Sequence, residues 1–185
     1  MLTQIINGQT LTPQGWLKDG SVLISDGKIL EVTNSDLAVI GAKVVDAKGM
    51  YIVPGFVAMN VHGGGGHDFK ECTEEAFHSA IAAHMKHGAT TLFPTLSSSP
   101  KELICKAVSI CEKLMAEKDG PVLGLHVEGP YLNTKMAGNL YDVKDPDEEE
   151  YRSILESTNC IKRWDASPEL PGAHDFARYL RSKDI

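Results

Sequence analysis

Short apolar runs, each ended by a polar group, recur along the second part of the chain. The run 56–61 ends at His62 and four glycines, and the run 122–127 ends at Glu128. A short apolar run bounded by turn residues is typical of a buried strand in a parallel sheet. Because the chemistry of an α/β barrel lies at the carboxyl ends of its strands, we expect both polar groups at the same edge.

From Pro54 onward, the pattern alternates between strand and helix, which favours a parallel sheet with right-handed crossovers. Ser99 before Pro100 predicts a capped helix start, with proline at the first helical position. The predicted strands are 56–61, 90–95, 122–128 and 161–166, and the predicted helices are 73–87, 100–118, 147–157 and 172–182.

The first 53 residues follow a different pattern, with short β runs and no helical periodicity. Asp26-Gly27 stands between two such runs and predicts the type I′ turn of a hairpin. A full eight-unit barrel takes roughly 250 residues, so residues 54–185 hold about half of one. We therefore predict an α/β fold: a small N-terminal β-sandwich portion (1–53), then the first half of a TIM-like (β/α) barrel (54–185).

Composition narrows the function classes. A net charge of −7 argues against nucleic acid or an anionic membrane as a partner. No apolar run approaches the ~20 residues that span a bilayer, and the N-terminus shows no signal-peptide pattern. The four cysteines lack the spacing of a metal or redox motif, which favours reduced, structural thiols and a cytoplasmic protein.

His62 and Glu128 are the leading candidates for chemistry. A metal that activates water takes imidazole and carboxylate ligands and keeps one position open. The alternative is that each is an ordinary hydrogen-bonded polar group at a strand end. His126 shares a strand face with Glu128, so we expect it in the barrel interior or behind the ligands. His67 and Asp68, in the glycine-rich loop, either bond a ligand or lie exposed.

Three stretches resemble a known family. Residues 54–66 (PGFVAMNVHGGGG) resemble the first barrel strand of the amidohydrolase superfamily. Residues 124–133 (GLHVEGPYLN) are similar to the signature of the N-acetylglucosamine-6-phosphate deacetylases, and residues 166–172 (ASPELPG) are similar to that family's fourth-strand end. The small β region before Pro54 also fits the family, so the resemblance covers the whole chain.

The resemblance implies a metal-dependent hydrolase that removes acetate from N-acetylglucosamine 6-phosphate and leaves glucosamine 6-phosphate. It implies a divalent metal, zinc or iron, held by Glu128 with His62, and a small-molecule amino sugar phosphate as substrate. It also implies a homodimer, as in the full-length family. The substrate-binding residues expected from it are Asn60, His62, Gly138 and Asn139. No catalytic residue is expected within this chain, because the family's catalytic aspartate is expected beyond Ile185.

The chain departs from the family pattern at several places. Where the superfamily commonly has Asp-x-His-x-His, this sequence has Ala58, Asn60 and His62, which weakens a two-metal site but allows one metal. Leu140 stands where relatives often have a His or Gln that contacts the substrate, and Asn139 is the neighbour able to replace it. We expect this piece, taken alone, to be inactive and to be unstable, oligomeric or dependent on the missing half.

Two other functions remain open at this point. One is a different amidohydrolase, acting on a cyclic amide or another N-acyl sugar. The other is a non-catalytic, truncated remnant that binds a sugar phosphate or a partner without hydrolysing it. Ala58, Asn60 and Leu140 favour the second, whereas the stretch 128–133 favours the deacetylase.

Overall fold

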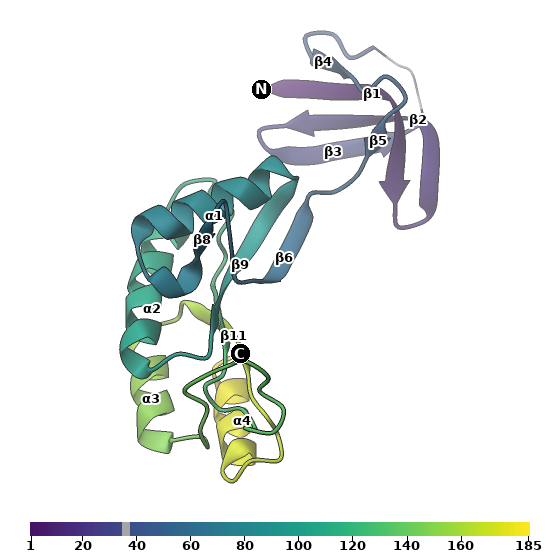
Figure 1. Ribbon diagram of the computed structural model, residues 1–185. Coiled ribbons are helices and arrows are strands. Elements are labelled where there is room, and N and C mark those ends of the chain that lie inside the picture. The colour runs from purple at the N-terminus through teal and green to yellow at the C-terminus, as the bar shows by residue number, and fades with distance from the viewer. Residues whose placement is uncertain (35–37) are drawn as a thin grey trace. The chain divides into compact units, whose positions relative to one another are not determined.

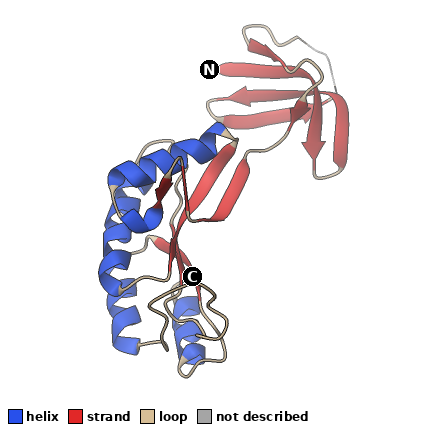
Figure 2. Cartoon of the chain, in the orientation of Figure 1, coloured by secondary structure: helices blue, strands red, loops and turns tan. Residues whose placement is uncertain are grey.

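The computed structural model describes residues 1–34 and 38–185. The chain divides into two compact units, Met1–Pro54 and Gly55–Ile185. Strands make up the first unit, and strands alternate with helices in the second (Figure 2). No helix among the described residues is long and apolar enough to cross a bilayer.

The first unit is one five-stranded sheet with the strand order β3-β2-β1-β4, and β5 also pairs with β1. Asp26 and Gly27 both have positive φ angles, 50° and 77°, which confirms the predicted hairpin turn between β2 and β3. The β2 strand begins at Gly15. The strands are β1 (Leu2–Thr12), β2 (Gly15–Ser25), β3 (Lys28–Thr33), β4 (Lys43–Asp46) and β5 (Tyr51–Ile52).

This first sheet has little core of its own. Among its described residues, Val22 and Ala47 are the buried apolar side chains, whereas many others are exposed. A sheet that is apolar on one face normally buries that face against another layer. The described residues of this unit contain a single sheet, so the sandwich stays a prediction.

The second unit carries a four-stranded parallel sheet with the order β11-β10-β9-β6, which confirms the four predicted strand–helix units. Figure 1 shows α1, α2 and α3 along one side of this sheet. Its strands are β6 (Phe56–Val61), β9 (Ala89–Ser97), β10 (Leu125–Glu128) and β11 (Ile161–Asp165). Its helices are α1 (Glu74–Lys86), α2 (Lys101–Met115), α3 (Glu148–Ser157) and α4 (Ala173–Ser182). Between β6 and α1 lie β7 (Gly63–Gly64), β8 (His67–Asp68) and the 3₁₀ turn η1 (Phe69–Glu71).

Local signals explain two of the four α-helix starts. The Thr73 side chain accepts a hydrogen bond from the Ala76 amide at α1, and Asp147 accepts one from the Glu150 amide at α3. The predicted Ser99 cap is wrong. Pro100 occupies the cap position of α2, and the Ser99 hydroxyl donates to the carbonyl of Ser97.

The third predicted strand also starts later than expected. Val122 makes an isolated bridge to Leu92, and regular pairing begins only at Leu125. Gly124 lies between them in close contact with the Lys162 side chain and the Cys160 carbonyl. A side chain at position 124 would meet those atoms, so only glycine lets the two strands approach here.

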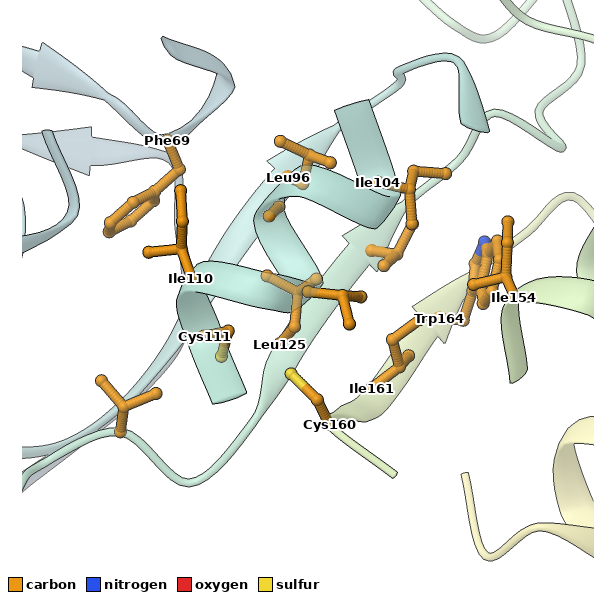
Figure 3. Close-up of a cluster of buried hydrophobic side chains, with 14 of the residues drawn as sticks. Phe69, Leu96, Ile104, Ile110, Cys111, Leu125, Ile154, Cys160, Ile161 and Trp164 are labelled. Atoms are coloured by element: carbon orange, nitrogen blue, oxygen red, sulfur yellow. The ribbon is translucent and has the colours of Figure 1, made fainter. Parts of the chain in front are cut away.

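The core of the second unit lies between the sheet and the helices (Figure 3). Alternate strand residues face the helices and are fully or nearly fully buried, as the strand period of two requires. Cys111 and Cys160 belong to this core as free thiols, whereas Cys105 is exposed on the other face of α2. The buried strand residues include Leu92, Leu96, Leu125, Val127 and Ile161, and the helix residues packed with them include Phe77, Ile104, Ile110, Ile154 and Phe176.

The opposite, inner face of the sheet is open. Val57, Met59 and Leu123 are 58%, 52% and 54% exposed. A cavity of about 180 Å³ on this face is lined by Met59, Phe93, Lys162 and Arg163. In the described part of the chain, β6 and β11 each pair on one side only, so both outer edges of the sheet are free.

Candidate functional site

The carboxyl edge of the four-stranded sheet brings His62 and Glu128 together. His62 directly follows β6, and Glu128 is the last residue of β10. His62 Nε2 lies 3.1 Å from Glu128 Oε2, and the two side chains are 44% and 26% exposed. The pair therefore stands at the end of the sheet where an α/β barrel keeps its active site, within reach of solvent.

A shift in strand pairing positions His62. Strand β6 pairs with β9 up to Ala58, and the register then changes before Val61. At that point the Val61 amide donates to the Thr95 side-chain oxygen, Oγ1, over 3.0 Å. The Thr95 hydroxyl thus replaces a backbone carbonyl as the hydrogen-bond acceptor for the Val61 amide. This contact fixes the end of β6, one residue before His62.

Beneath the pair lies a second imidazole that solvent does not reach. His126 is fully buried, as expected from its strand face, and its Nδ1 is 3.1 Å from Thr95 Oγ1. Its Nε2 lies 3.1 Å from Asp165 Oδ2, but the two atoms are not aligned for a hydrogen bond. Burial lowers the pKa of His126, and the nearby Asp165 carboxylate opposes that shift.

Asp165 is the main residue of this edge that the sequence reasoning missed. It ends β11 as Glu128 ends β10, and the two are register partners on neighbouring parallel strands. Arg163 binds it with two hydrogen bonds of 3.0 Å each. The signal available in the sequence was its position at a strand end. Arg163 lies two residues before it, and side chains two residues apart on a strand share a face.

Whether the described residues fit a metal depends on how many ligands they bring together. An imidazole nitrogen and a carboxylate oxygen at 3.1 Å suit two adjacent ligands of one ion, since each bond to zinc is about 2.0–2.2 Å. A catalytic zinc takes three protein ligands, however, and the described residues contain no group of three or more that could hold a metal. His62 and Glu128 therefore fit as part of a metal centre and do not complete one.

The other residues predicted to bind substrate are Asn60, Gly138 and Asn139, and all three are exposed. Asn60 is exposed on β6, within the stretch where the register shifts. Gly138 and Asn139 are exposed in the loop 129–146, and no hydrogen bond or ion pair in the described structure joins them to Glu128.

The predictions for His67 and Asp68 can be compared with the structure. His67 contacts Glu71 at 3.1 Å, and Asp68 caps η1, so both serve the loop itself. The glycine loop folds back onto α1, where the half-buried His84 has its Nε2 2.9 Å from the Gly63 carbonyl oxygen. A side chain at position 65 would collide with the Ser79 carbonyl oxygen.

Aromatic packing fixes the chain just after Glu128. The Trp164 indole donates to the Gly129 carbonyl over 2.7 Å, and its ring stacks on Tyr131 with centroids 5.7 Å apart. The Tyr131 hydroxyl donates to Glu150, which also pairs with Lys144. The acidic start of α3 thus has a partner in the core. Burial, reinforced by that carboxylate, raises the pKa of Tyr131.

Comparison with known proteins shows which proteins this chain is similar to. No protein-family model matches the chain. It is 32% identical over 137 residues to N-acetylglucosamine-6-phosphate deacetylase of Haemophilus influenzae, covering 72% of this chain and 35% of the relative. It is 26% identical over 190 residues to the Homo sapiens deacetylase of the same name, covering 96% of this chain and 44% of the relative.

Solved structures agree with the sequence matches. The Mycobacterium smegmatis N-acetyl-D-glucosamine-6-phosphate deacetylase superposes with a TM-score of 0.86 at 28% identity, over 100% of this chain and 52% of that chain. The Pasteurella multocida enzyme gives 0.92 at 21% identity, over 100% and 49%, which supports the fold alone. The chain thus spans about half the length of its relatives or less. In sequence and in fold, it matches the N-terminal part of the N-acetylglucosamine-6-phosphate deacetylases, which have the amidohydrolase barrel fold.

Proposed function

We propose that this chain forms one half of the active site of a metal-dependent deacetylase. The reaction is hydrolysis of the N-acetyl group of N-acetylglucosamine 6-phosphate, which yields glucosamine 6-phosphate and acetate. The observation that carries the proposal is the contact between His62 and Glu128 at the carboxyl edge of the sheet, inside the segment that matches the deacetylases. In this proposal the protein acts in the cytoplasm, a compartment in which cysteine thiols stay reduced.

Glu128 and His62 are the proposed metal ligands from this chain, with zinc or iron as the metal. A bound ion would polarise the amide carbonyl and activate a water molecule. The chain's own contribution is to hold the two side chains in place: pairing with β9 and β11 fixes the backbone of Glu128, and the Thr95 contact fixes the backbone before His62. The remaining ligands and the general base are expected from residues outside those described.

The amino sugar phosphate is the proposed small-molecule substrate, and Asn60, Gly138 and Asn139 are its proposed contacts. Asn60 and Asn139 carry amides that both donate and accept hydrogen bonds, as sugar hydroxyls require. Gly138 has a φ of 61° and open space around its Cα, so the backbone there can approach a ligand closely. All three are exposed, which leaves them free for this role.

A second candidate is a chain that binds the sugar phosphate without hydrolysing it. The specific observation in its favour is Ala58, because the superfamily pattern has a carboxylate ligand at that place. The described residues bring only two adjacent metal ligands together at this edge, which also favours a chain that does not hydrolyse the sugar phosphate.

Acetate release from N-acetylglucosamine 6-phosphate, measured with zinc or ferrous iron supplied, separates these candidates. Release above the blank that is lost in Glu128→Gln and kept in Glu156→Gln supports the deacetylase. Glu156 is a suitable control because it lies exposed on α3, bonded to the Tyr179 hydroxyl.

Calorimetric binding of the same sugar phosphate completes the test. Binding without release supports the non-catalytic candidate. A protein that neither binds the sugar phosphate nor releases acetate contradicts both.

A further inference from the structure

The four glycines that follow His62 give the backbone great freedom next to a proposed metal ligand. Glycine loses more conformational freedom on folding than any other residue. Within residues 63–66, here called the glycine segment, Gly65 and Gly66 have positive φ angles of 61° and 89°. A ligand beside such a segment keeps its place only if other contacts hold the backbone.

Backbone hydrogen bonds close this segment on itself. Strands β7 and β8 pair as a two-stranded antiparallel sheet, so the segment turns back along its own path. The Phe69 amide then donates to the His62 carbonyl oxygen over 2.9 Å. Because the Phe69 side chain has no solvent exposure, this bond joins the backbone of His62 to the core.

Helix α1 lies against the glycine segment and contacts both β7 and β8 (Figure 1). A Cβ atom at position 64 would lie 3.2 Å from the Ala80 carbonyl oxygen, and one at position 65 would lie 2.9 Å from the Ser79 carbonyl oxygen. The absence of side chains therefore brings the backbone of the segment within reach of a polar side chain on the helix.

His84 is the side chain of α1 that makes this contact. Its Nε2 lies 2.9 Å from the Gly63 carbonyl oxygen. A carbonyl oxygen can only accept, so His84 Nε2 carries the hydrogen and donates it. The bond meets the backbone one residue after His62, whereas Thr95 bonds the Val61 amide one residue before it. Side chains from two elements, α1 and β9, thus hold the backbone on both sides of His62.

We infer that His84 is a positioning residue for the candidate metal site. Its hydrogen bond to the Gly63 carbonyl fixes the start of the glycine segment, and this keeps the His62 imidazole beside Glu128. The inference rests on the metal role proposed above for His62. His84 acts through the backbone and is not itself a proposed ligand.

Two substitutions of His84 isolate the hydrogen bond from the bulk of the side chain. Leucine and glutamine both favour helices, but only glutamine carries an N–H that can donate to the carbonyl. We expect His84→Leu to weaken zinc binding about tenfold, since removing a partner that orients a metal ligand costs at least that much. His84→Gln is expected to regain most of the affinity. Equilibrium dialysis of the full chain measures both variants.

The matched control is His78→Leu, because His78 is an exposed histidine on the same helix. It is expected to bind zinc as the wild-type chain does. Urea denaturation of all three variants verifies that each is folded, and the unfolding midpoints of His84→Leu and His84→Gln are expected to be similar. A general loss of stability would instead lower the midpoint and the zinc affinity together.

Hydrogen exchange provides a readout without metal. In the zinc-free chain, the amides of residues 63–68 are expected to exchange faster in His84→Leu than in the wild-type chain or in His84→Gln. Faster exchange that is confined to this segment supports the positioning role even if the proposed deacetylation fails.

The possible failures can be told apart. If His84→Leu binds zinc at wild-type affinity while Glu128→Gln does not, the inference is overturned and the metal site remains. If both variants keep wild-type affinity, the proposed metal role is refuted and the inference falls with it. Equal losses of affinity in His84→Leu and His84→Gln would assign the effect to packing of the imidazole ring and would also overturn the inference.

Discussion

The two faces of the four-stranded sheet have opposite properties although the same strands build both. On the helix-covered face, Leu92 and Leu125 have no solvent exposure and pack among helix side chains. On the inner face, Val57 and Met59 remain more than half exposed. The difference shows that the folded unit buries its apolar side chains on one face and leaves those of the other face exposed.

Polar groups are divided in the same way. The inner face holds two polar pairs near its carboxyl edge, His62 with Glu128 and His126 with Asp165, each joined by a contact of 3.1 Å. The buried cluster on the helix-covered face consists of apolar side chains together with the free thiols of Cys111 and Cys160. Substitutions on the two faces are therefore expected to have different effects, which the following variants measure.

The largest effect is expected from removing a core side chain on the helix-covered face. Leu92→Ala should lower the free energy of unfolding by about 2–5 kcal/mol, because it leaves a cavity in a packed interior. Val57→Ala, on the neighbouring strand but the inner face, should change it by no more than about 0.5 kcal/mol in the monomer. Urea denaturation of both variants at low protein concentration makes the comparison, and equal losses would contradict it.

A smaller loss is expected at the residue that joins β6 to the buried histidine. Thr95→Val removes the oxygen that accepts from the Val61 amide, so unfolding should become easier by about 1–3 kcal/mol. Zinc affinity should also fall, because His62 loses its anchor. Thr95→Ser keeps the oxygen and should restore zinc affinity. If Thr95→Val alters stability but leaves zinc affinity intact, then Thr95 has only a structural role.

Tyr131 provides a pH-dependent comparison within the core. Its pKa is raised by burial, so the folded state holds the phenol proton more tightly than the unfolded state. Stability is therefore fully present below the unfolded tyrosine pKa of about 10 and is lost as pH rises above it. Tyr131→Phe should flatten that alkaline loss and should cost about 1 kcal/mol at neutral pH for the bond to Glu150. Denaturation curves at several alkaline pH values check both expectations.

The sequence predicted the elements well because their signals are local. The Asp26-Gly27 turn and the apolar runs each depend on a few neighbouring residues. Ser99 failed as a cap because its hydroxyl had a competing acceptor, the carbonyl of Ser97, that only the folded loop presents.

The site was less predictable because its residues meet across strands. Glu128 and His62 were found from their places at strand ends, but the contact between them crosses β9 and depends on the register shift in β6. Thr95 gave no signal of its own in the sequence, and Asp165 gave only its position at a strand end. Their roles arise from the pairing of Thr95 with His126 and of Glu128 with Asp165, which are properties of the assembled sheet.

Zinc affinity of the Glu128→Gln variant, measured by equilibrium dialysis, tests the central claim most directly. The matched control is Glu71→Gln, since Glu71 contacts His67 at the same 3.1 Å but lies in η1 and not at the end of a strand. We predict that Glu128→Gln weakens zinc binding at least tenfold while Glu71→Gln leaves it unchanged. Zinc binding that survives Glu128→Gln at full affinity would contradict the assignment of a metal site to this edge of the sheet.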